Sequence, residues 1–191
     1  PVSIFENIGG FVDSVTWEER LGNSVVYYDP IGVIAAITPW NFPMYQIAAK
    51  VAPAMVAGCT VVLKPSVLAP LTAYVLAEAV HEAGVAPGVF NLVVGSGDTV
   101  GERLVAHPKV AMTSFTGSLS GGRRVGEVAA NGVQPVVLEL GGKSPAIVLD
   151  DASDEMLAGA IEAAIFTCTM NAGQVCEAIT RVLVPRPLLR R

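Results

Sequence analysis

Residues 32–66 read GVIAAITPWNFPMYQIAAKVAPAMVAGCTVVLKPS and contain one complete strand–helix–strand pattern. The apolar run Gly32–Ile37 predicts a strand, Met44–Ala57 predicts a helix, and Thr60–Leu63 predicts a second strand. A proline stands at the expected start of the helix and a glycine follows its expected end, as these residues prefer. Because both strands are apolar on both sides, the pattern is typical of a parallel sheet that helices cover.

The same alternation continues to about Asp150. Further strands are expected at Phe90–Val94, Ala111–Phe115, Pro135–Glu139 and Ala146–Leu149, and further helices at Leu71–Ala83, Thr99–Ala106 and Ser118–Ala130. Thr99 followed by Glu102 predicts a capping box at the start of one of these helices. The fold class is therefore α/β, a mostly parallel sheet with helices on both faces.

Both ends of the chain depart from this alternation. Polar Thr16–Arg20 and the weakly alternating Ser24–Tyr28 predict the end of a helix followed by a hairpin arm. Near the other end, Ser153–Met170 predicts a long helix and Arg181–Pro185 a strand. One face of that helix is apolar and includes Cys168.

Composition excludes several classes of protein. Of 191 residues, 52% are hydrophobic and 15% are charged, which suits a packed core rather than a disordered chain. The net charge of −5 and the lack of a basic run argue against nucleic-acid binding. Apolar stretches are interrupted before ~18 residues, which argues against a membrane span, and no signal-peptide pattern is visible. An odd number of cysteines and no zinc-ligand spacing favour a reducing, cytoplasmic setting without a metal site.

Cys176 follows a glycine-containing turn at the end of the long helix, in NAGQVC. A cysteine held partly exposed in this way can act as a thiolate nucleophile. The alternative is a small buried hydrophobic residue, an interpretation that suits Cys168 and Cys59 better.

Two further side chains suit catalysis. Glu139 ends an apolar strand before two glycines, where a carboxylate can act as a general base, or can simply be a solvated strand end. Asn41 lies between a strand and a helix, where its amide can stabilise an oxyanion or can cap the helix.

Other residues suit a nucleotide. Lys64 ends a strand and can bind a ribose or phosphate, or extend to solvent. Gly117 and Gly122 flank a strand-to-helix turn that suits a pyrophosphate, although a tight turn needs glycine in any case. Gly97 also follows a strand, but its spacing to Gly101 misses the dinucleotide fingerprint by one residue.

Five motifs together resemble the aldehyde dehydrogenase superfamily. They are PWNFP at 39–43, LKPS at 63–66, FTGS at 115–118, ELGGK at 139–143 and NAGQVC at 171–176. The resemblance covers nearly the whole chain. It implies an oligomerisation arm with the end of a helix in residues 1–30, part of a Rossmann-like NAD(P)-binding domain in 31–142, and the start of a second α/β catalytic domain in 143–191.

The resemblance implies a role for each candidate. Cys176 attacks an aldehyde to give a thiohemiacetal, whose oxyanion Asn41 and the Cys176 backbone N–H hold. Hydride passes to the nicotinamide, and Glu139 activates the water that releases a carboxylic acid from the thioester. Expected cofactor contacts are Lys64 at the adenine ribose, Gly117, Ser118 and Gly122 at the pyrophosphate, Ile37, Thr38, Trp40 and Gly97 along the cleft, and Leu140 and Gly141 near the nicotinamide. The parent protein is expected to be a homodimer or homotetramer.

Two departures from the family pattern matter. Val67 stands where the family often has an acidic residue that repels a 2′-phosphate, so the cofactor can be NAD or NADP. The chain is also shorter than family members at both ends, so the isolated piece is expected to be a poor or inactive catalyst. Two other functions stay open: a coenzyme A-acylating relative, and a non-catalytic dinucleotide-binding fragment.

Overall fold

The computed structural model describes residues 1–190, and their contacts divide the chain into two compact units, Pro1–Glu139 and Leu140–Arg191. The sequence places the corresponding boundary three residues later, after residue 142. Each unit is described by itself.

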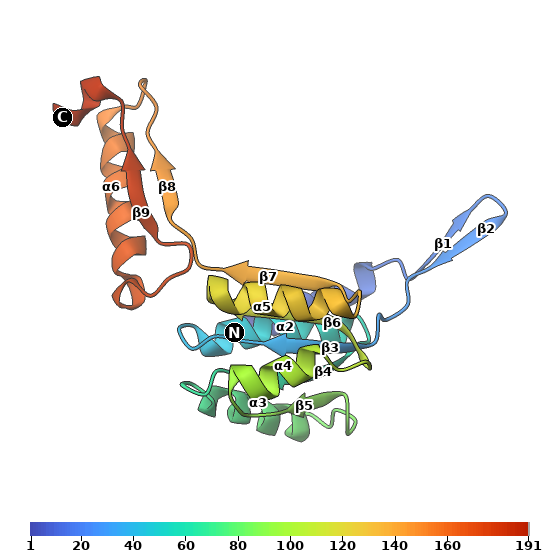
Figure 1. The fold of residues 1–191 in the computed structure, drawn as a ribbon. Helices are drawn as coiled ribbons and strands as arrows, with labels where there is room; N and C mark the ends of the chain where they lie inside the picture. The colour runs from blue at the N-terminus through green and yellow to red at the C-terminus, as the bar shows by residue number, and fades with distance from the viewer. Residues whose placement is uncertain (191) are drawn as a thin grey trace. The chain divides into compact units, whose positions relative to one another are not determined.

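The first unit is built on a five-stranded sheet (Figure 1). Its strands, in the order β5-β4-β3-β6-β7, are β5 (Phe90–Leu92), β4 (Thr60–Lys64), β3 (Val33–Ile37), β6 (Val110–Gly117) and β7 (Val136–Leu140). The pairs β3–β4, β3–β6 and β4–β5 are parallel, and β7 runs in the same direction as β3 in Figure 1. The chain moves outward from β3 to β5 and then returns to the other side of β3, so the strand order reverses between β3 and β6.

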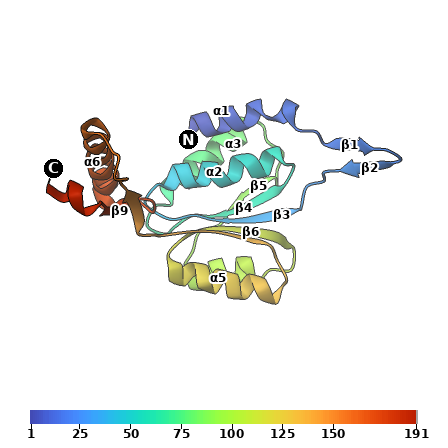
Figure 2. The same ribbon diagram turned by 90° about the horizontal axis from the view of Figure 1, so that it is seen from above.

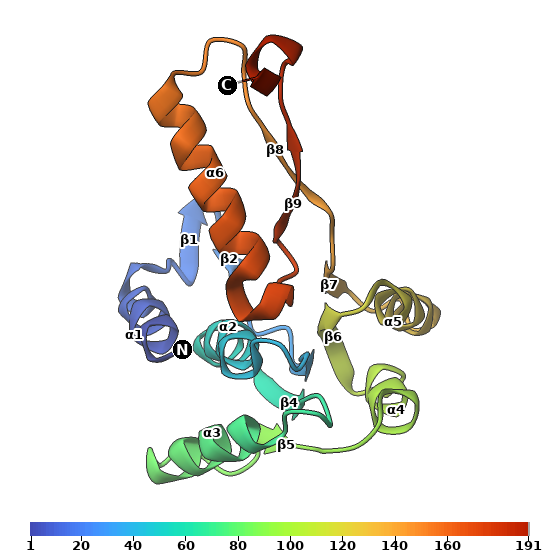
Figure 3. The ribbon, with the colours of Figure 1, turned by 90° about the vertical axis from the view of Figure 1, so that its left-hand side faces the viewer.

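Helices cover both faces of this sheet, as the sequence predicts (Figures 2 and 3). On one face lie α2 (Pro43–Val56) and α3 (Leu71–Glu82), and α1 (Val2–Gly10) packs against α2. On the other face lie α4 (Glu102–Val105) and α5 (Leu119–Asn131). The core between β3, β4, α2 and α3 is fully apolar at its centre, with Ile47, Val51, Val61 and Leu63 at 0% exposure.

The helix expected at Thr99–Ala106 differs from its prediction. Ser96, not Thr99, is the cap, because its Oγ accepts the backbone N–H of Thr99 at 3.2 Å. The chain first makes a wide π turn over η2 (Gly97–Gly101) and becomes α-helical only in α4. The prediction of a capping box at Thr99 was therefore wrong. Glu102 does not accept the backbone N–H of Thr99, because its carboxylate accepts hydrogen bonds from Arg124.

A hairpin is present near the N-terminus, but the expectation that Thr16–Arg20 ends a helix was wrong, because α1 ends at Gly10 and this segment enters the first strand of the hairpin. Strands β1 (Glu18–Leu21) and β2 (Ser24–Tyr27) pair antiparallel after the short turn η1 (Val12–Ser14). Figure 1 shows the hairpin projecting from the sheet, and its side chains are exposed or half-buried. That this arm serves oligomerisation stays a prediction.

The second unit is a single β–α–β element. The strands β8 (Ser144–Ile147) and β9 (Ile179–Leu183) are parallel, and α6 (Asp154–Thr169) packs against β9. The short turns η3 (Met170–Gly173) and η4 (Arg186–Arg190) follow α6 and β9. Within this unit α6 is covered on one side only, so Cys168 is exposed and the expectation that it is buried was wrong.

One segment of the described residues, Asp154–Gly173, is long and apolar enough to cross a membrane, with a mean hydropathy of 1.2. It includes α6, whose apolar stretch the sequence suggested would be too short. Helices that pack inside globular domains satisfy the same criterion, so length and composition alone do not make this segment a membrane span.

Candidate functional site

The carboxyl ends of β3 and β4 lie level with each other beside β6, which continues to Gly117. The register places Ile37, the last residue of β3, beside both Lys64 of β4 and Phe115 of β6. Thr38 then crosses toward β4, and its N–H donates to the Lys64 carbonyl at 3.1 Å. This edge is the carboxyl end of the sheet where the strand order reverses, which is where open α/β folds bind ligands.

The turn from β6 to α5 requires glycine. A Cβ on Gly117 would lie 2.6 Å from Cζ of Phe115, and one on Gly121 would lie 2.9 Å from the same atom. Ser118 caps α5 by accepting the Gly121 N–H at 3.1 Å, and Gly122 is buried in the first turn. A bare backbone at the start of a 13-residue helix is a good surface for an anionic group.

An open pocket of about 460 Å³, including the solvent at its mouth, lies between α4 and α5. Its residues come from the ends of β3 and β6, from η2 and α4, and from α5. They are Ile37, Gly97, Asp98, Gly101, Glu102, Val105, Phe115, Gly121, Arg124, Val125 and Val128. The structure thus brings together two of the predicted cofactor contacts, Ile37 and Gly97, in a slot that is mostly apolar.

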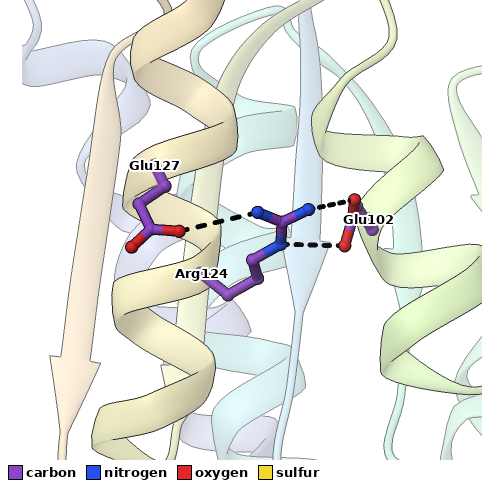
Figure 4. Close-up of polar contacts among 3 residues, drawn as sticks. All are labelled: Glu102, Arg124 and Glu127. Carbon is purple, nitrogen blue, oxygen red and sulfur yellow. Dashed lines mark hydrogen bonds and ion pairs between the residues drawn. The ribbon is translucent and has the colours of Figure 1, made fainter.

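An ion pair joins the two walls of this pocket (Figure 4). Arg124 donates from Nε to Glu102 Oε2 at 3.0 Å and from Nη2 to Oε1 at 2.5 Å. A weaker contact of 3.5 Å links Arg124 to Glu127 within α5. The hydrogen bond from Arg124 lowers the pKa of Glu102, and the same bond raises the pKa of Arg124. Sequence analysis missed this pair, because no local pattern links residues on different helices.

Two buried hydroxyls lie at this edge without a hydrogen-bond partner among residues 1–190. They are Oγ1 of Thr38, which is 3% exposed, and Oγ1 of Thr116, which follows the strand position paired with Ile37. Leaving a buried hydroxyl unpaired is unfavourable. Neither Thr38 nor Thr116 is among the residues that line the pocket between α4 and α5.

Lys64 does not extend to solvent. It is 4% exposed, its Nζ donates to the Pro65 carbonyl at 2.9 Å, and burial lowers its pKa. Its Cδ lies 3.6 Å from where a Cβ of Gly101 would be, so its stem runs beside a residue that lines the pocket. The structure therefore brings Lys64 to the pocket side of the sheet edge.

A second buried lysine was missed by the sequence analysis. Lys50 of α2 is 8% exposed, and its Nζ donates to Oγ of Ser114 at 3.0 Å. Burial lowers the pKa of Lys50 to about 8, and the charge of Glu139 acts in the opposite direction. The sequence did contain a signal for this burial. Lys50 is three residues from Ile47 in an apolar helix, so both residues lie on the same helical face, which packs into the core.

Several predicted residues lie outside the pocket lining. Trp40 is 45% exposed and Asn41 is half-buried, both between β3 and α2. Phe42, not Asn41, occupies the cap position of α2. Glu139, Leu140 and Gly141 stand on or after β7, where Glu139 and Gly141 are exposed and Leu140 is half-buried. The lining also lacks the predicted contacts Thr38, Lys64, Gly117, Ser118 and Gly122.

Cys176 belongs to the second unit, whereas Asn41 and Glu139 belong to the first. It is exposed, in the loop between η3 and β9. The preceding turn holds Asn171, Ala172 and Gly173 at φ values of 50°, 56° and 78°. Consecutive left-handed residues other than glycine are strained, and such strain gathers at functional sites. Across residues 1–190 no group of three or more His, Cys, Asp or Glu side chains is arranged to hold a metal ion.

Known proteins match this chain along nearly all of its length. The sequence model of the aldehyde dehydrogenase family matches residues 3–191. The chain is 54% identical over 169 residues to 3-succinoylsemialdehyde-pyridine dehydrogenase of a Pseudomonas species, covering 88% of this chain and 35% of that protein. It is 47% identical to lactaldehyde dehydrogenase of Escherichia coli K12, covering 88% of this chain and 35% of that protein.

A solved structure has the same fold. The aldehyde dehydrogenase C of Pseudomonas syringae, a cysteine-to-alanine variant in complex with NAD⁺ and octanal, superimposes with a TM-score of 0.90 at 47% identity. The match covers 99% of this chain and 39% of that one, so the chain spans little more than a third of the length of its relatives. On this match to the family model and to relatives of known fold, the chain belongs to the aldehyde dehydrogenase family.

Proposed function

We propose that this chain is the dinucleotide-binding and cysteine-bearing part of an enzyme that oxidises an aldehyde to a carboxylic acid with NAD⁺ or NADP⁺. The observation that carries the proposal is the carboxyl edge of β3 and β6. There an open pocket adjoins the glycine turn at the start of α5, whose Gly121 lines the pocket. In the same chain, exposed Cys176 follows a strained turn, and we take its thiol as the nucleophile.

The residues at this edge fit a dinucleotide. The apolar slot between α4 and α5 suits an adenine ring, Lys64 suits the adjacent ribose, and the backbone after Gly117 suits the pyrophosphate with Ser118 and Gly122. Thr38 and Trp40 would contact the cofactor beyond β3, and Leu140 and Gly141 would approach the nicotinamide. When bound, the nicotinamide supplies the hydride acceptor for the oxidation.

The protein residues supply the rest of the chemistry. The Cys176 thiolate adds to the aldehyde carbon, and the Asn41 amide with the Cys176 N–H stabilises the resulting oxyanion. Loss of hydride leaves a thioester on Cys176. Glu139 takes a proton from water, which attacks the thioester, releases the carboxylic acid and returns the thiol. The negative charge of Glu139 favours the charged form of buried Lys50, so the two groups are electrostatically linked.

The relatives support this proposal. The Pseudomonas syringae enzyme holds NAD⁺ and octanal when a cysteine is replaced by alanine. That is the expected behaviour of an enzyme whose nucleophile has been removed. That relative binds a small aldehyde, octanal, and we propose the same class of substrate for this protein. We further propose, from the resemblance of the sequence motifs alone, that the parent protein assembles as a homodimer or homotetramer through the β1–β2 arm and works in the cytoplasm.

The test is the formation of reduced nicotinamide, measured by absorbance. The chain, its longer parent and the Cys176→Ala variant of each are mixed with a short aliphatic or an aromatic aldehyde, and with NAD⁺ or NADP⁺. We expect cysteine-dependent turnover by the parent and little by this chain alone, because the chain covers only 35% of the length of the relative that it matches. A parent enzyme that turns over equally well without Cys176 would refute the mechanism.

The coenzyme A-acylating alternative has its own readout. A hydrolytic enzyme forms product without coenzyme A, and its Glu139→Gln variant accumulates the thioester. Product that appears only when coenzyme A is added would favour the acylating relative instead.

A further inference from the structure

The walls of the pocket differ in how firmly they are held. One wall is α5, a helix of 13 residues that packs on β6 and buries Val125 and Ala129. The other wall is η2 and α4, a single π turn with glycine at both ends followed by only four α-helical residues. A helix this short is not stable by itself, so its position depends on tertiary contacts.

Few contacts fix the position of α4. Val105 is 2% exposed and anchors the end of the helix in the core. At its beginning, Glu102 is joined to Arg124 of α5 by the paired hydrogen bonds of 3.0 and 2.5 Å, across 22 residues of sequence. Both side chains line the pocket and both reach solvent. A bidentate arginine–carboxylate pair fixes direction as well as distance, since both groups are planar.

We propose that the Glu102–Arg124 ion pair holds α4 against α5 and thereby fixes the width of the pocket, which makes Arg124 a positioning residue for the adenine end of the cofactor that the proposed function requires. The glycines at 97, 101 and 121 allow a flat ring to approach the backbone of both walls. Without the pair, the end of α4 keeps the buried Val105 and its packing on β6, but its beginning loses the side-chain link to α5, and the slot loses its fixed spacing. Breaking the ion pair therefore weakens the binding of the adenine moiety and does not affect the catalytic step.

The test measures binding to the chain itself. NADH, 5′-AMP and nicotinamide mononucleotide are titrated into the wild type, Arg124→Leu and Glu127→Gln by calorimetry. Glu127 is the matched control, because it contacts Arg124 at 3.5 Å within α5 but does not line the pocket. We expect Arg124→Leu to lower the affinities for NADH and 5′-AMP by the same factor of about two to five, which is the typical contribution of an exposed ion pair. Glu127→Gln and the mononucleotide should show no change.

Two further measurements separate the link from a general effect on folding. The charge-swapped pair Glu102→Arg with Arg124→Glu, made with Glu127→Gln to remove repulsion, should recover most of the affinity. The difference in NADH affinity between the wild type and Arg124→Leu should become smaller at about 1 M salt, because salt screens exposed charges. If Arg124→Leu does not fold, Glu102→Gln breaks the same link from the other helix.

The outcomes are distinguishable. A wild-type chain that binds neither NADH nor 5′-AMP would overturn the proposed cofactor site and the ion-pair role together. A wild type that binds both, with an Arg124→Leu variant of equal affinity, would overturn the ion-pair role alone. Equal losses in Glu127→Gln and Arg124→Leu would also overturn it, because local charge and not the link between helices would then be responsible.

Discussion

The Nζ of Lys50 donates a hydrogen bond to Oγ of Ser114 at 3.0 Å, joining α2 to β6 beneath the carboxyl edge of the sheet. The two residues are 64 positions apart, and the lysine is almost fully buried. Placing an ammonium group there disfavours its charged form, which is why the pKa of Lys50 falls to about 8.

This buried cation makes stability depend on pH. Between about pH 8 and 10.5 the unfolded chain keeps the Lys50 proton and the folded chain does not, so the free energy of unfolding rises with pH. Lys50→Met should remove this rise, which amounts to roughly 3 kcal/mol. Urea unfolding at several pH values measures it, with exposed Lys109→Met as control. A wild type and a Lys50→Met variant with parallel pH profiles would contradict the prediction.

The glycine turn after β6 should not tolerate a side chain. Gly117→Ala places a Cβ against the Phe115 ring, and the overpacking should lower the free energy of unfolding by about 1–3 kcal/mol. Gly126→Ala is the matched control inside α5, where the nearest atom is 3.9 Å away and alanine should stabilise the helix by up to ~1 kcal/mol. Chemical denaturation compares the two, and similar effects of both would show that the turn has room.

Val67 should govern the choice between the two cofactors. It is 53% exposed and follows Lys64 by three residues. Val67→Glu adds a carboxylate that repels a 2′-phosphate, so binding of NADPH should fall about tenfold relative to NADH. Val67→Gln is the control, because glutamine has the shape of glutamate without its charge. If both cofactors lose affinity equally, the adenine ribose does not lie near this residue.

The three cysteines should differ in reactivity. Cys176 and Cys168 are exposed and Cys59 is buried at 4% exposure, so a folded chain should react with a thiol reagent at two sites. The third site should react only after unfolding. Counting modified thiols by mass spectrometry tests this, and Cys176→Ala should leave a single fast site. Rapid modification of Cys59 in the folded chain would contradict the placement of β4 in the core.

Local sequence patterns predicted most strands and helices well, because the apolar residues of each one recur with the period of that kind of element. Strands β3, β4 and β6 fall within one or two residues of their expected bounds. The turn at Gly117 and the exposure of Cys176 also follow from nearby residues. Their roles with Asn41 and Glu139 in catalysis stay predictions, which rest on the resemblance of five motifs and not on contacts in the structure.

By itself, the sequence determined the order of strands and helices, the family and the approximate position of each strand, since all of these depend on neighbours along the chain. Only the tertiary structure decided that Lys50 is buried against Ser114, that Glu102 pairs with Arg124 instead of capping its own helix, and that Cys168 is exposed. Each of these depends on which elements become neighbours in space. Strand order and helix packing fix those neighbours, and no local periodicity records them.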